Sequence, residues 1–342
     1  MGRRSLAQDT AEFLACTFGT IPFSLREAVA AGLPLDRLYR AARAGSVRRL
    51  SLGVYVVALQ EEPDEPTWGV QARHSTDEAR GAALVLPGSA VSANSAALVQ
   101  GLPVPLRSLA SGHVTDPGRR AGLRRGVHVH SAALPEHHVT LISGVRVTTP
   151  ERTAVDIARM TSLPEALICM DAVLRRFIDH ACEGQLPLRM AVHDPALIEA
   201  ARSRVATVLA DMHGWPGTRR AHLALQFADP AAESALESES RGVLIERGVP
   251  RPECGFPIVG ADGRTYWADM AWREGRVIGE CDGLVKYADH RALYGEKLRQ
   301  EAIENAGSRV IRWTRTDIVR SPDRLAGRVL RALDEGDGCQ GE

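Results

Sequence analysis

The fold of the C-terminal third is decided by residues 269–287, which read DMAWREGRVIGECDGLVKY. Two apolar strand patterns, at 264–272 and 276–282, flank a short turn rich in charge and glycine. Such a spacing predicts two antiparallel strands joined by a tight connection. The acidic residues of this stretch therefore have predictable positions on a sheet.

Three carboxylates are predicted to converge at one end of this strand pair. Glu280 and Asp282 are two residues apart on one strand, so their side chains leave the same face. Asp269 lies near the end of the preceding strand and can meet them across the pair. Converging carboxylates repel one another unless a cation neutralises them. Oxygen ligands favour Mg²⁺ or Mn²⁺ over zinc, and such an ion supports phosphodiester hydrolysis.

Lysine is nearly absent from the chain, which has 2 lysines among its 42 lysine and arginine residues. Both lie close to these carboxylates, at Lys286 and Lys297. A nearby ammonium group can stabilise the extra negative charge of a phosphoryl-transfer transition state. The sequence thus indicates a metal-dependent nuclease site, and it leaves open the alternative that the carboxylates are surface charges at a hairpin end.

The surrounding elements extend the pattern. The expected order is helix, three strands, helix, strand, over residues 233–247, 255–259, 264–272, 276–282, 289–306 and 309–313, with a closing helix from about 316. This α-β-β-β-α-β order resembles the PD-(D/E)xK nuclease superfamily, and more closely its very-short-patch-repair-like endonuclease branch, known as DUF559. The motifs that carry the resemblance are Ser234–Arg241, Asp269, Glu280–Gly283, Lys286–Tyr287, Glu296–Arg299 and Val310–Arg312.

The resemblance covers residues 232–333 and implies roles for individual carboxylates. Asp269 and Glu280 would be metal ligands, and Glu237 of the preceding helix would be a third carboxylate or would support the ligands from outside. The implied catalytic residues are Asp269, Glu280, Asp282, Lys286 and Glu237.

One position departs from the superfamily pattern. Asp282 stands where the general motif carries its lysine. Lys286 could supply the ammonium from a displaced position, and Lys297 or Arg299 on the next helix are further candidates. The departure also leaves open a nuclease-like domain without activity that serves as a scaffold.

The N-terminal region predicts three helices followed by a β-hairpin. Ser24 is a predicted N-cap with Glu27 three residues on, and Asp36 is a predicted cap of the third helix. The expected elements are helices over 8–18, 25–31 and 36–44 and a hairpin over 47–57. This pattern is typical of a winged helix-turn-helix, whose third helix enters the major groove of DNA.

The segments Phe23–Ala28 and Arg49–Tyr55 resemble the N-terminal domain of AbiEi-type antitoxins. The resemblance implies DNA binding, often to the protein's own promoter, and a partner toxin. Five arginines are the candidate phosphate contacts, namely Arg37, Arg40, Arg43, Arg48 and Arg49. A small helical domain that only packs on its neighbours is the alternative.

The middle region carries structural signals. Helices are expected over 77–86, 93–100, 164–176 and 195–212, and strands over 126–130 and 144–147. Thr149 is a predicted cap for a helix with Pro150 at its first position. The segments Ser92–Ala97 and Thr148–Asp156 resemble the middle domain of the same antitoxin-like proteins.

Histidines are concentrated in the middle region. They stand at His113, His128, His130, His137 and His138. A His-x-His pair on a strand can present two imidazoles on one face, but no third ligand stands at a fitting spacing. Surface or phosphate-contacting histidines are the simpler interpretation.

Bulk composition is ordinary for a globular protein, with 44% hydrophobic and 25% charged residues. The formal net charge of zero argues against coating of nucleic acid through bulk charge. The 6 scattered cysteines form no Cys-x-x-Cys pair, so a reducing cytoplasm is expected. No apolar run approaches the roughly 18 residues that span a bilayer.

Together these patterns predict an α+β multidomain protein. The expected domains are a winged helix-turn-helix over 1–60, a middle antitoxin-like α/β region with a helical linker over 67–230, and a restriction-endonuclease-like domain over 232–333. The leading hypothesis is a DNA endonuclease that uses Mg²⁺ or Mn²⁺. The alternatives are an antitoxin or transcriptional repressor whose nuclease-like domain is inactive or binds a partner, and a nucleic-acid-binding scaffold. The sequence indicates no oligomeric state.

Overall fold

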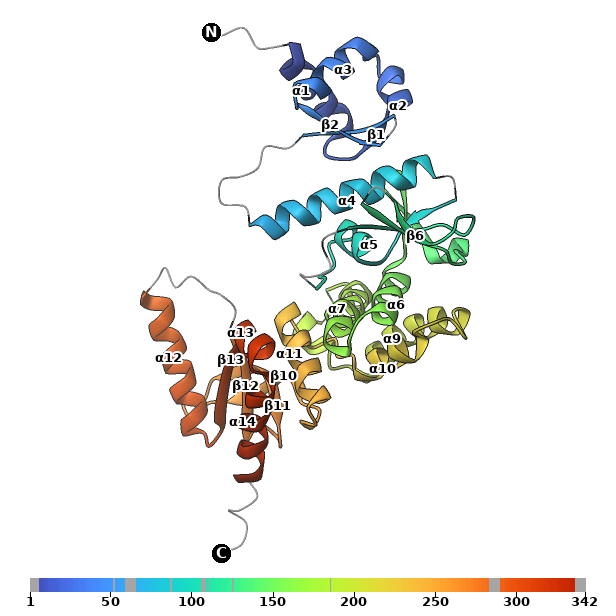
Figure 1. The fold of residues 1–342 in the computed structure, drawn as a ribbon. Helices are drawn as coiled ribbons and strands as arrows, with labels where there is room; N and C mark the ends of the chain where they lie inside the picture. Colours follow the sequence, from blue (N-terminus) through green and yellow to red (C-terminus); the bar gives the residue numbers. More distant parts are fainter. Residues whose placement is uncertain are drawn as a thin grey trace, which may run out of the picture. The chain divides into compact units, whose positions relative to one another are not determined.

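The computed structural model describes residues 6–51, 53–58, 66–86, 88–105, 109, 111–124, 126–184, 186–282 and 290–335. The chain divides into two compact units, Met1–Asp156 and Ile157–Glu342, which we call unit 1 and unit 2. Figure 1 shows a mixed α/β protein with several helices and sheets. The mixed α/β class predicted from the sequence is therefore confirmed.

Unit 1 begins with a helical part that carries a small sheet. Its elements are α1 (Leu6–Phe18), β1 (Phe23–Ser24), α2 (Leu25–Ala30), α3 (Leu35–Arg43), β2 (Val47–Ser51) and β3 (Val54–Val57). The strands pair antiparallel in the order β1-β3-β2. Gly53, with a φ of +76°, connects β2 to β3 in a backbone region that glycine enters without strain.

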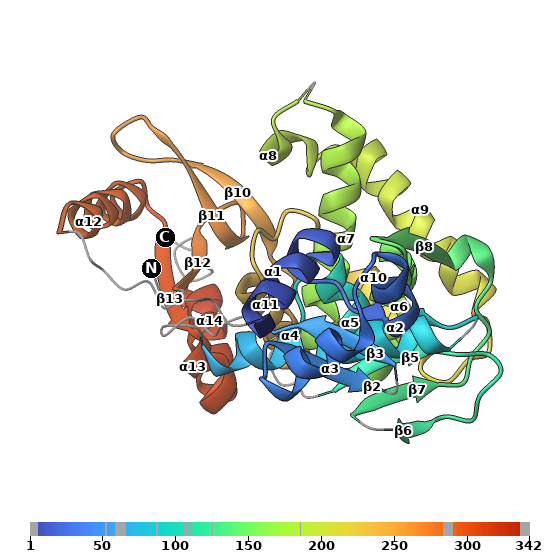
Figure 2. The same ribbon diagram turned by 90° about the horizontal axis from the view of Figure 1, so that it is seen from above.

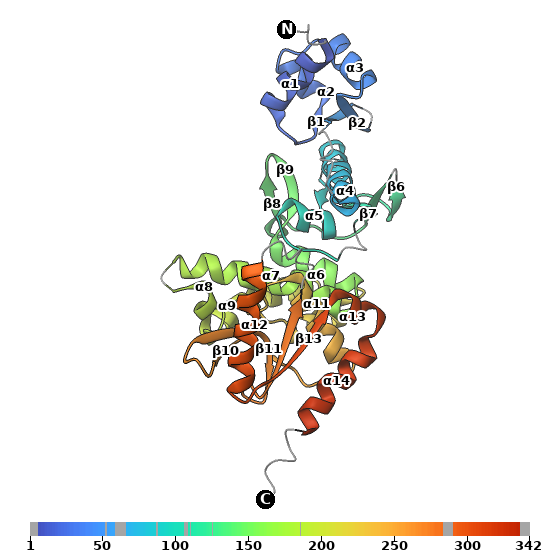
Figure 3. The same cartoon turned by 90° about the vertical axis from the view of Figure 1, so that its left-hand side faces the viewer.

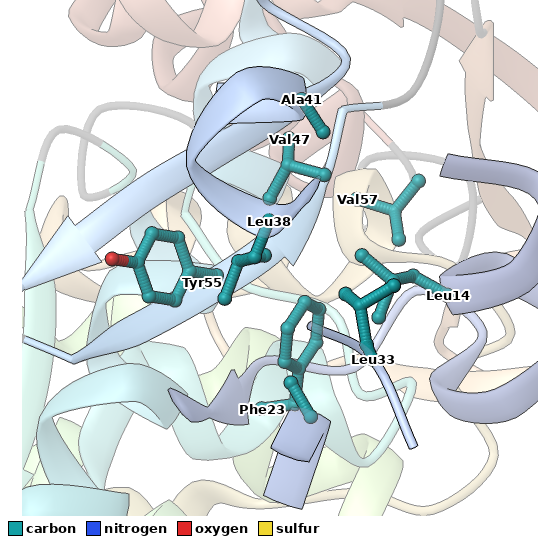
Figure 4. Packing of buried hydrophobic residues seen from close by; sticks show 9 residues of the cluster. Leu14, Phe23, Leu33, Leu38, Ala41, Val47, Tyr55 and Val57 are labelled. Carbon is teal, nitrogen blue, oxygen red and sulfur yellow. The ribbon is translucent and has the colours of Figure 1, made fainter. Parts of the chain in front are cut away.

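A compact apolar core joins these helices to the sheet (Figure 4). Leu14 of α1 and Leu38 of α3 are fully buried, and Phe23 and Tyr55 of the paired strands pack against them. Because Leu38 and Ala41 face this core, the residues between them on α3 are exposed to solvent. The apolar spacing seen in the sequence thus orients α3.

The two helix caps predicted in this part have different outcomes. Ser24 and Glu27 form the expected capping box at the start of α2. The prediction for Asp36 was wrong, because Pro34 occupies the N-cap of α3. Asp36 lies inside the first turn, where its carboxylate pairs with Arg40 one turn further on.

The rest of unit 1 is built on a mixed sheet. Its elements are α4 (Thr67–Val85), β4 (Ala90–Val91), α5 (Ala93–Val99), β5 (Gly112–Thr115), β6 (Gly122–Arg124), β7 (Val127–His130), η2 (Glu136–His138), β8 (Val139–Ile142), β9 (Val145–Thr148) and α6 (Pro150–Met160), the last of which runs into unit 2. Among the described residues the strand order is β6-β7-β5-β4-β9-β8. Figure 3 looks along α4, with β8 and β9 on one side of the helix and β6 and β7 on the other.

Small and β-branched residues make the contact between α4 and this sheet. Ala79 of α4 packs with Val91, Val114 and Val147 of three neighbouring strands, and all four are fully buried. Gly112 of β5 allows the close approach, because a Cβ there would lie 2.8 Å from the Ser75 carbonyl oxygen. The helix therefore lies directly on the sheet backbone.

Unit 2 opens with a helical layer. It consists of α7 (Leu163–Cys182), α8 (Leu188–Ala191), α9 (Pro195–Asp211) and α10 (Thr218–Phe227), followed by α11 (Ala235–Glu246). Asp171 of α7 and Arg241 of α11 form a fully buried ion pair of 2.6 Å. Gly242 permits α11 to touch α7, since a Cβ there would lie 2.4 Å from the Pro164 Cα atom.

The sheet of unit 2 follows α11 in the element order that the sequence predicts. Its elements are β10 (Glu253–Val259), β11 (Thr265–Trp272), β12 (Val277–Asp282), α12 (His290–Asn305), β13 (Arg309–Thr314), α13 (Arg315–Arg320) and α14 (Pro322–Glu335). Strands β10, β11 and β12 pair antiparallel, and β13 pairs parallel with β12 after the α12 crossover.

Two different helical groups cover the faces of this sheet (Figure 2). Ile303 of α12 packs on Ile278 of β12. On the opposite face the Trp313 indole donates a hydrogen bond to Ser240 of α11 at 2.9 Å. Gly279 makes room for that indole, because a Cβ there would lie 2.4 Å from the Trp313 ring. The carboxyl end of β12 is therefore held between α11 and α12.

Candidate functional site

A cavity of about 410 Å³ opens where α11, β11 and α12 meet in unit 2. Glu237 of α11, Asp269 of β11 and Arg299 of α12 line it. Two of the other lining residues, Arg189 and Trp267, were not singled out in the sequence analysis. Glu280 and Asp282 of the neighbouring strand β12 are not among the lining residues.

Asp269 occupies the point where two strands separate. The described pairing of β11 with β12 runs from Trp272 to Met270, which pairs with Gly279. One residue further on, the Asp269 carboxylate accepts the backbone N–H of Cys281 at 2.6 Å. Asp269 therefore lies in the middle of β11, at the end of the pairing between β11 and β12. The sequence analysis had predicted it near the end of its strand.

Glu280 is buried on β12 beside a cation from the crossover helix. The residue is 7% exposed, and Arg299 donates to its carboxylate at 3.0 Å. The same guanidinium nitrogen donates to the Trp267 carbonyl at 2.7 Å. Burial, and then the charge of Asp269, raise the pKa of Glu280 to about 7.

Glu237 is the third carboxylate of the cluster and lies in the first turn of α11. Ser234 caps this turn by accepting the Glu237 backbone N–H at 3.2 Å. The Glu237 carboxylate accepts the backbone N–H of Glu233 at 2.8 Å. Burial and the charge of Asp269 raise the pKa of Glu237 to about 7 as well.

The charge of Asp269 acts on both Glu237 and Glu280. Burial is also the main cause that raises the pKa of Asp269, which the Cys281 N–H and Arg299 partly oppose. In the described residues, the oxygens of Glu237, Asp269 and Glu280 do not all lie within 4.8 Å of one another. A hard divalent cation fits this donor set by its oxygen chemistry, and it would relieve the repulsion.

The remaining predicted site residues have different surroundings. Asp282 ends β12, where Arg312 of β13 donates to it at 3.4 Å. Lys286 lies outside the described residues. Lys297 is exposed on α12 and lies 3.9 Å from Glu301. Among the cations considered from the sequence and described in the structure, Arg299 is the one that contacts Glu280.

Sequence reasoning missed Arg189 and Trp267. Arg189 donates to Glu233 at 3.1 Å, and its guanidinium carbon lies 5.2 Å from the centre of the Trp267 ring. No local pattern marks Arg189, because it belongs to the four-residue helix α8, far from the carboxylates in sequence. Trp267 had a usable signal, since it lies two residues before Asp269.

The five predicted DNA-contacting arginines of unit 1 differ in their surroundings. Arg37, Arg40 and Arg43 are exposed on α3, and Arg49 is exposed on β2. Arg48 is half-buried and forms an ion pair of 2.7 Å with Asp77 of α4. Four of the five residues are thus exposed, although Arg40 pairs with Asp36 and Arg49 donates to the Ser51 carbonyl.

The histidines of the middle region include a stacked group. His113 of β5 lies beside His128 and His130 of β7, with ring centroids 5.1 and 5.3 Å from its own. Burial, and then the charges of His130 and His128, lower the pKa of His113 to about 3. The three ring planes are inclined by 10 to 25° to one another, and His113 Nδ1 and His130 Nε2 lie 3.0 Å apart. Among the described residues, the ring nitrogens of the three histidines do not all lie within 4.8 Å of one another.

None of the helices in the described part of the chain is long and apolar enough to cross a bilayer. This finding agrees with the absence of a long apolar run in the sequence.

Comparisons with known proteins place the resemblance in the middle of the chain. Residues 89–205 match the family model described as the AbiEi antitoxin C-terminal domain. An uncharacterized protein of Mycobacterium tuberculosis strain H37Rv is 32% identical over 222 residues, which are 65% of this chain and 73% of that protein. An uncharacterized protein of M. tuberculosis strain CDC 1551 matches with the same identity and coverage.

Proposed function

The chain belongs to the same protein family as these two mycobacterial proteins and contains a region similar to the AbiEi antitoxin C-terminal domain, and on this basis we propose that it is a DNA-binding regulator of the antitoxin type. The similarity of residues 89–205 to that domain carries the proposal. A partner toxin is part of the same proposal.

The N-terminal part of unit 1 would read the DNA as a winged helix-turn-helix. Its order of three helices followed by the β2–β3 hairpin supports this assignment. Leu38 is buried in the core, and the exposed face of α3 carries Arg37, Arg40 and Arg43. These arginines would contact phosphates, which position the helix on duplex DNA without reading the sequence.

A binding assay on DNA from upstream of the protein's own gene tests this role. The double variant Arg40→Glu with Arg43→Glu should weaken binding and flatten its dependence on salt concentration, because fewer counterions are released. The matched control is Arg219→Glu with Arg220→Glu, two exposed arginines on α10. Equal binding by both double variants would exclude α3 as the DNA-contacting helix.

Neutralisation of a partner can be tested in cells. The product of an adjacent gene that arrests growth when expressed alone is the expected toxin. Co-expression of the full chain should restore growth. Growth arrest that persists at every expression level of this chain would contradict the antitoxin role.

A second function is favoured by the carboxylate cluster of unit 2. We propose that it is a metal-dependent phosphodiesterase site in which Asp269 and Glu280 hold Mg²⁺ or Mn²⁺. The raised pKa values of Glu237 and Glu280 support this role, because clustered buried carboxylates of this kind mark functional sites. When bound, the ion would activate water and stabilise charge on the phosphate. Arg299 would orient Glu280 and add positive charge.

Cleavage and metal binding test this second function separately. Duplex, nicked, mismatched and single-stranded DNA should be cut in Mg²⁺ or Mn²⁺, and Asp269→Ala or Glu280→Ala should abolish cutting. Calorimetric titration with Mn²⁺ gives a readout independent of turnover. Glu304→Gln, an exposed change on α12, is the control. Metal binding without cleavage of any substrate would indicate an inactive site. Asp269→Ala and Glu280→Ala variants that keep both metal binding and cleavage would contradict the assignment.

A further inference from the structure

Unit 1 contains a second cavity, of about 440 Å³, between the hairpin strands and α4. Residues of β2, β3 and α4 line it, and these elements are in contact within the unit. Its volume falls in the range of small-molecule sites, which is on the order of 300–1,000 Å³. Neither the DNA-contacting arginines of α3 nor the carboxylate cluster belongs to this cavity.

The charged residues of the cavity are mostly cationic. Arg48, Arg73 and Arg80 line it together with His74, and Asp77 is the acidic residue of the lining. Asp77 is buried and already accepts from Arg48 at 2.7 Å. Arg73 and Arg80 also line the cavity, and its described lining contains no second acidic side chain.

The surroundings of the Arg80 guanidinium suggest what the cavity binds. It is half-buried on α4, and within the described part of the chain its guanidinium makes no hydrogen bond or ion pair, with Asp77 attracting it only through space. Partial burial lowers the pKa of Arg80, and the charge of Asp77 opposes this shift. A partly desolvated guanidinium without an anion is unfavourable, and a bound oxyanion would satisfy its planar set of donors.

Part of the cavity lining is apolar. Val56 and Val57 of β3 line it together with Ala72 of α4 and Leu98 of α5. A ligand that fills both parts therefore needs an oxyanion at one end and a body of low polarity at the other. Phosphate is an oxyanion that suits a guanidinium group, because the guanidinium can donate two parallel hydrogen bonds to it.

We propose that this cavity is a binding site for a small organic phosphate of about nucleoside monophosphate size. The phosphate would bind Arg80 with support from Arg73, and the body would contact Val57 and Leu98. Because the walls come from both the hairpin and α4, an occupied site would hold these elements together. The site does not depend on the proposed DNA binding or on nuclease activity.

Calorimetric titration of the full chain tests the site with three probes at equal ionic strength: inorganic phosphate, AMP and adenosine. We expect saturable binding of phosphate and AMP, tighter for AMP, and none for adenosine. Arg80→Gln should weaken AMP binding by at least about tenfold, since it removes charge-assisted hydrogen bonds to the phosphate. Arg124→Gln, an exposed change on β6 of the same unit, should leave binding unchanged.

Arg80→Lys keeps the charge with a smaller change of shape, and it should bind AMP with intermediate affinity. This variant keeps the test valid if Arg80→Gln fails to fold. Absence of phosphate and AMP binding to the wild-type chain, or equal AMP binding by the wild type and both Arg80 variants, would overturn the proposal. Loss of duplex DNA binding in Arg80→Gln with no response of the wild type to phosphate or AMP would also overturn it and assign the cavity to the DNA-contacting surface.

Discussion

Replacement of Asp269 by Asn should stabilise unit 2 at alkaline pH when no divalent cation is present. The pKa values of Glu237 and Glu280 are about 7 in the folded chain and 4.5 in an ordinary environment. For each glutamate this difference corresponds to roughly 3 kcal/mol between its two protonation states. Because the folded-state pKa is raised, this contribution to stability is complete below about pH 4.5 and is lost as the pH rises through 7.

Asp269 is responsible for the smaller part of that loss, since burial is the larger cause for both glutamates. We assign its charge about 1 kcal/mol at each glutamate, so removal of the charge should stabilise unit 2 by about 2 kcal/mol at pH 8. The Asn side chain can still accept the Cys281 N–H that Asp269 accepts at 2.6 Å. At pH 5.5, where both glutamates are protonated, the gain should nearly vanish.

Urea denaturation in EDTA at pH 5.5 and pH 8 measures this difference. Tryptophan fluorescence is a suitable signal, because four of the five tryptophans lie in unit 2. Glu304→Gln, the exposed control on α12, should change stability by no more than about 0.5 kcal/mol at either pH. An Asp269→Asn variant that is less stable than the wild type at pH 8, or a gain of equal size at both pH values, would refute the reasoning.

Three further outcomes are expected. Gly279→Ala should destabilise unit 2 by about 1–3 kcal/mol, because its Cβ would lie 2.4 Å from the Trp313 ring. Gly295→Ala on α12 should instead stabilise unit 2 by about 0.5–1 kcal/mol, because its Cβ would meet nothing within 4 Å. The urea midpoints of the two variants measure this difference. Asp171→Ala should cost about 3–5 kcal/mol by the same assay, since it leaves the buried Arg241 cation without its partner at 2.6 Å. With 100-fold more Mn²⁺ than its dissociation constant, the wild type should gain about 2.7 kcal/mol at pH 8, and a gain of the same size in Glu280→Ala would contradict the metal site.

The sequence predicted the elements whose signal is local and long. The order from α11 to β13 was predicted because strand alternation and helical spacing extend over at least five residues in each element. The capping box of Ser24 is similarly local. Strands β4 and β6 were not predicted, because two or three residues carry no detectable alternation and depend on the sheet around them.

The candidate site shows the same division. The carboxylates Asp269 and Glu280 could be singled out because strand geometry relates them directly. The cation could not be chosen from sequence, because several positively charged residues follow β12 and only the packing of α12 brings Arg299 within 3.0 Å of Glu280. Arg48 was predicted as a phosphate contact with four other arginines, and its pairing with Asp77 depends on contact between the hairpin and α4.

The buried Asp171–Arg241 ion pair also limits how the chain can be divided. A fragment that begins at residue 232 would keep Arg241 and lose α7, so the guanidinium would meet solvent or apolar neighbours without its carboxylate. The α11 surface at Gly242 that contacts Pro164 would be uncovered at the same time. Such a fragment should express poorly or aggregate, whereas one that begins before Leu163 keeps both contacts. The helical layer is therefore a folding requirement of the sheet that follows it.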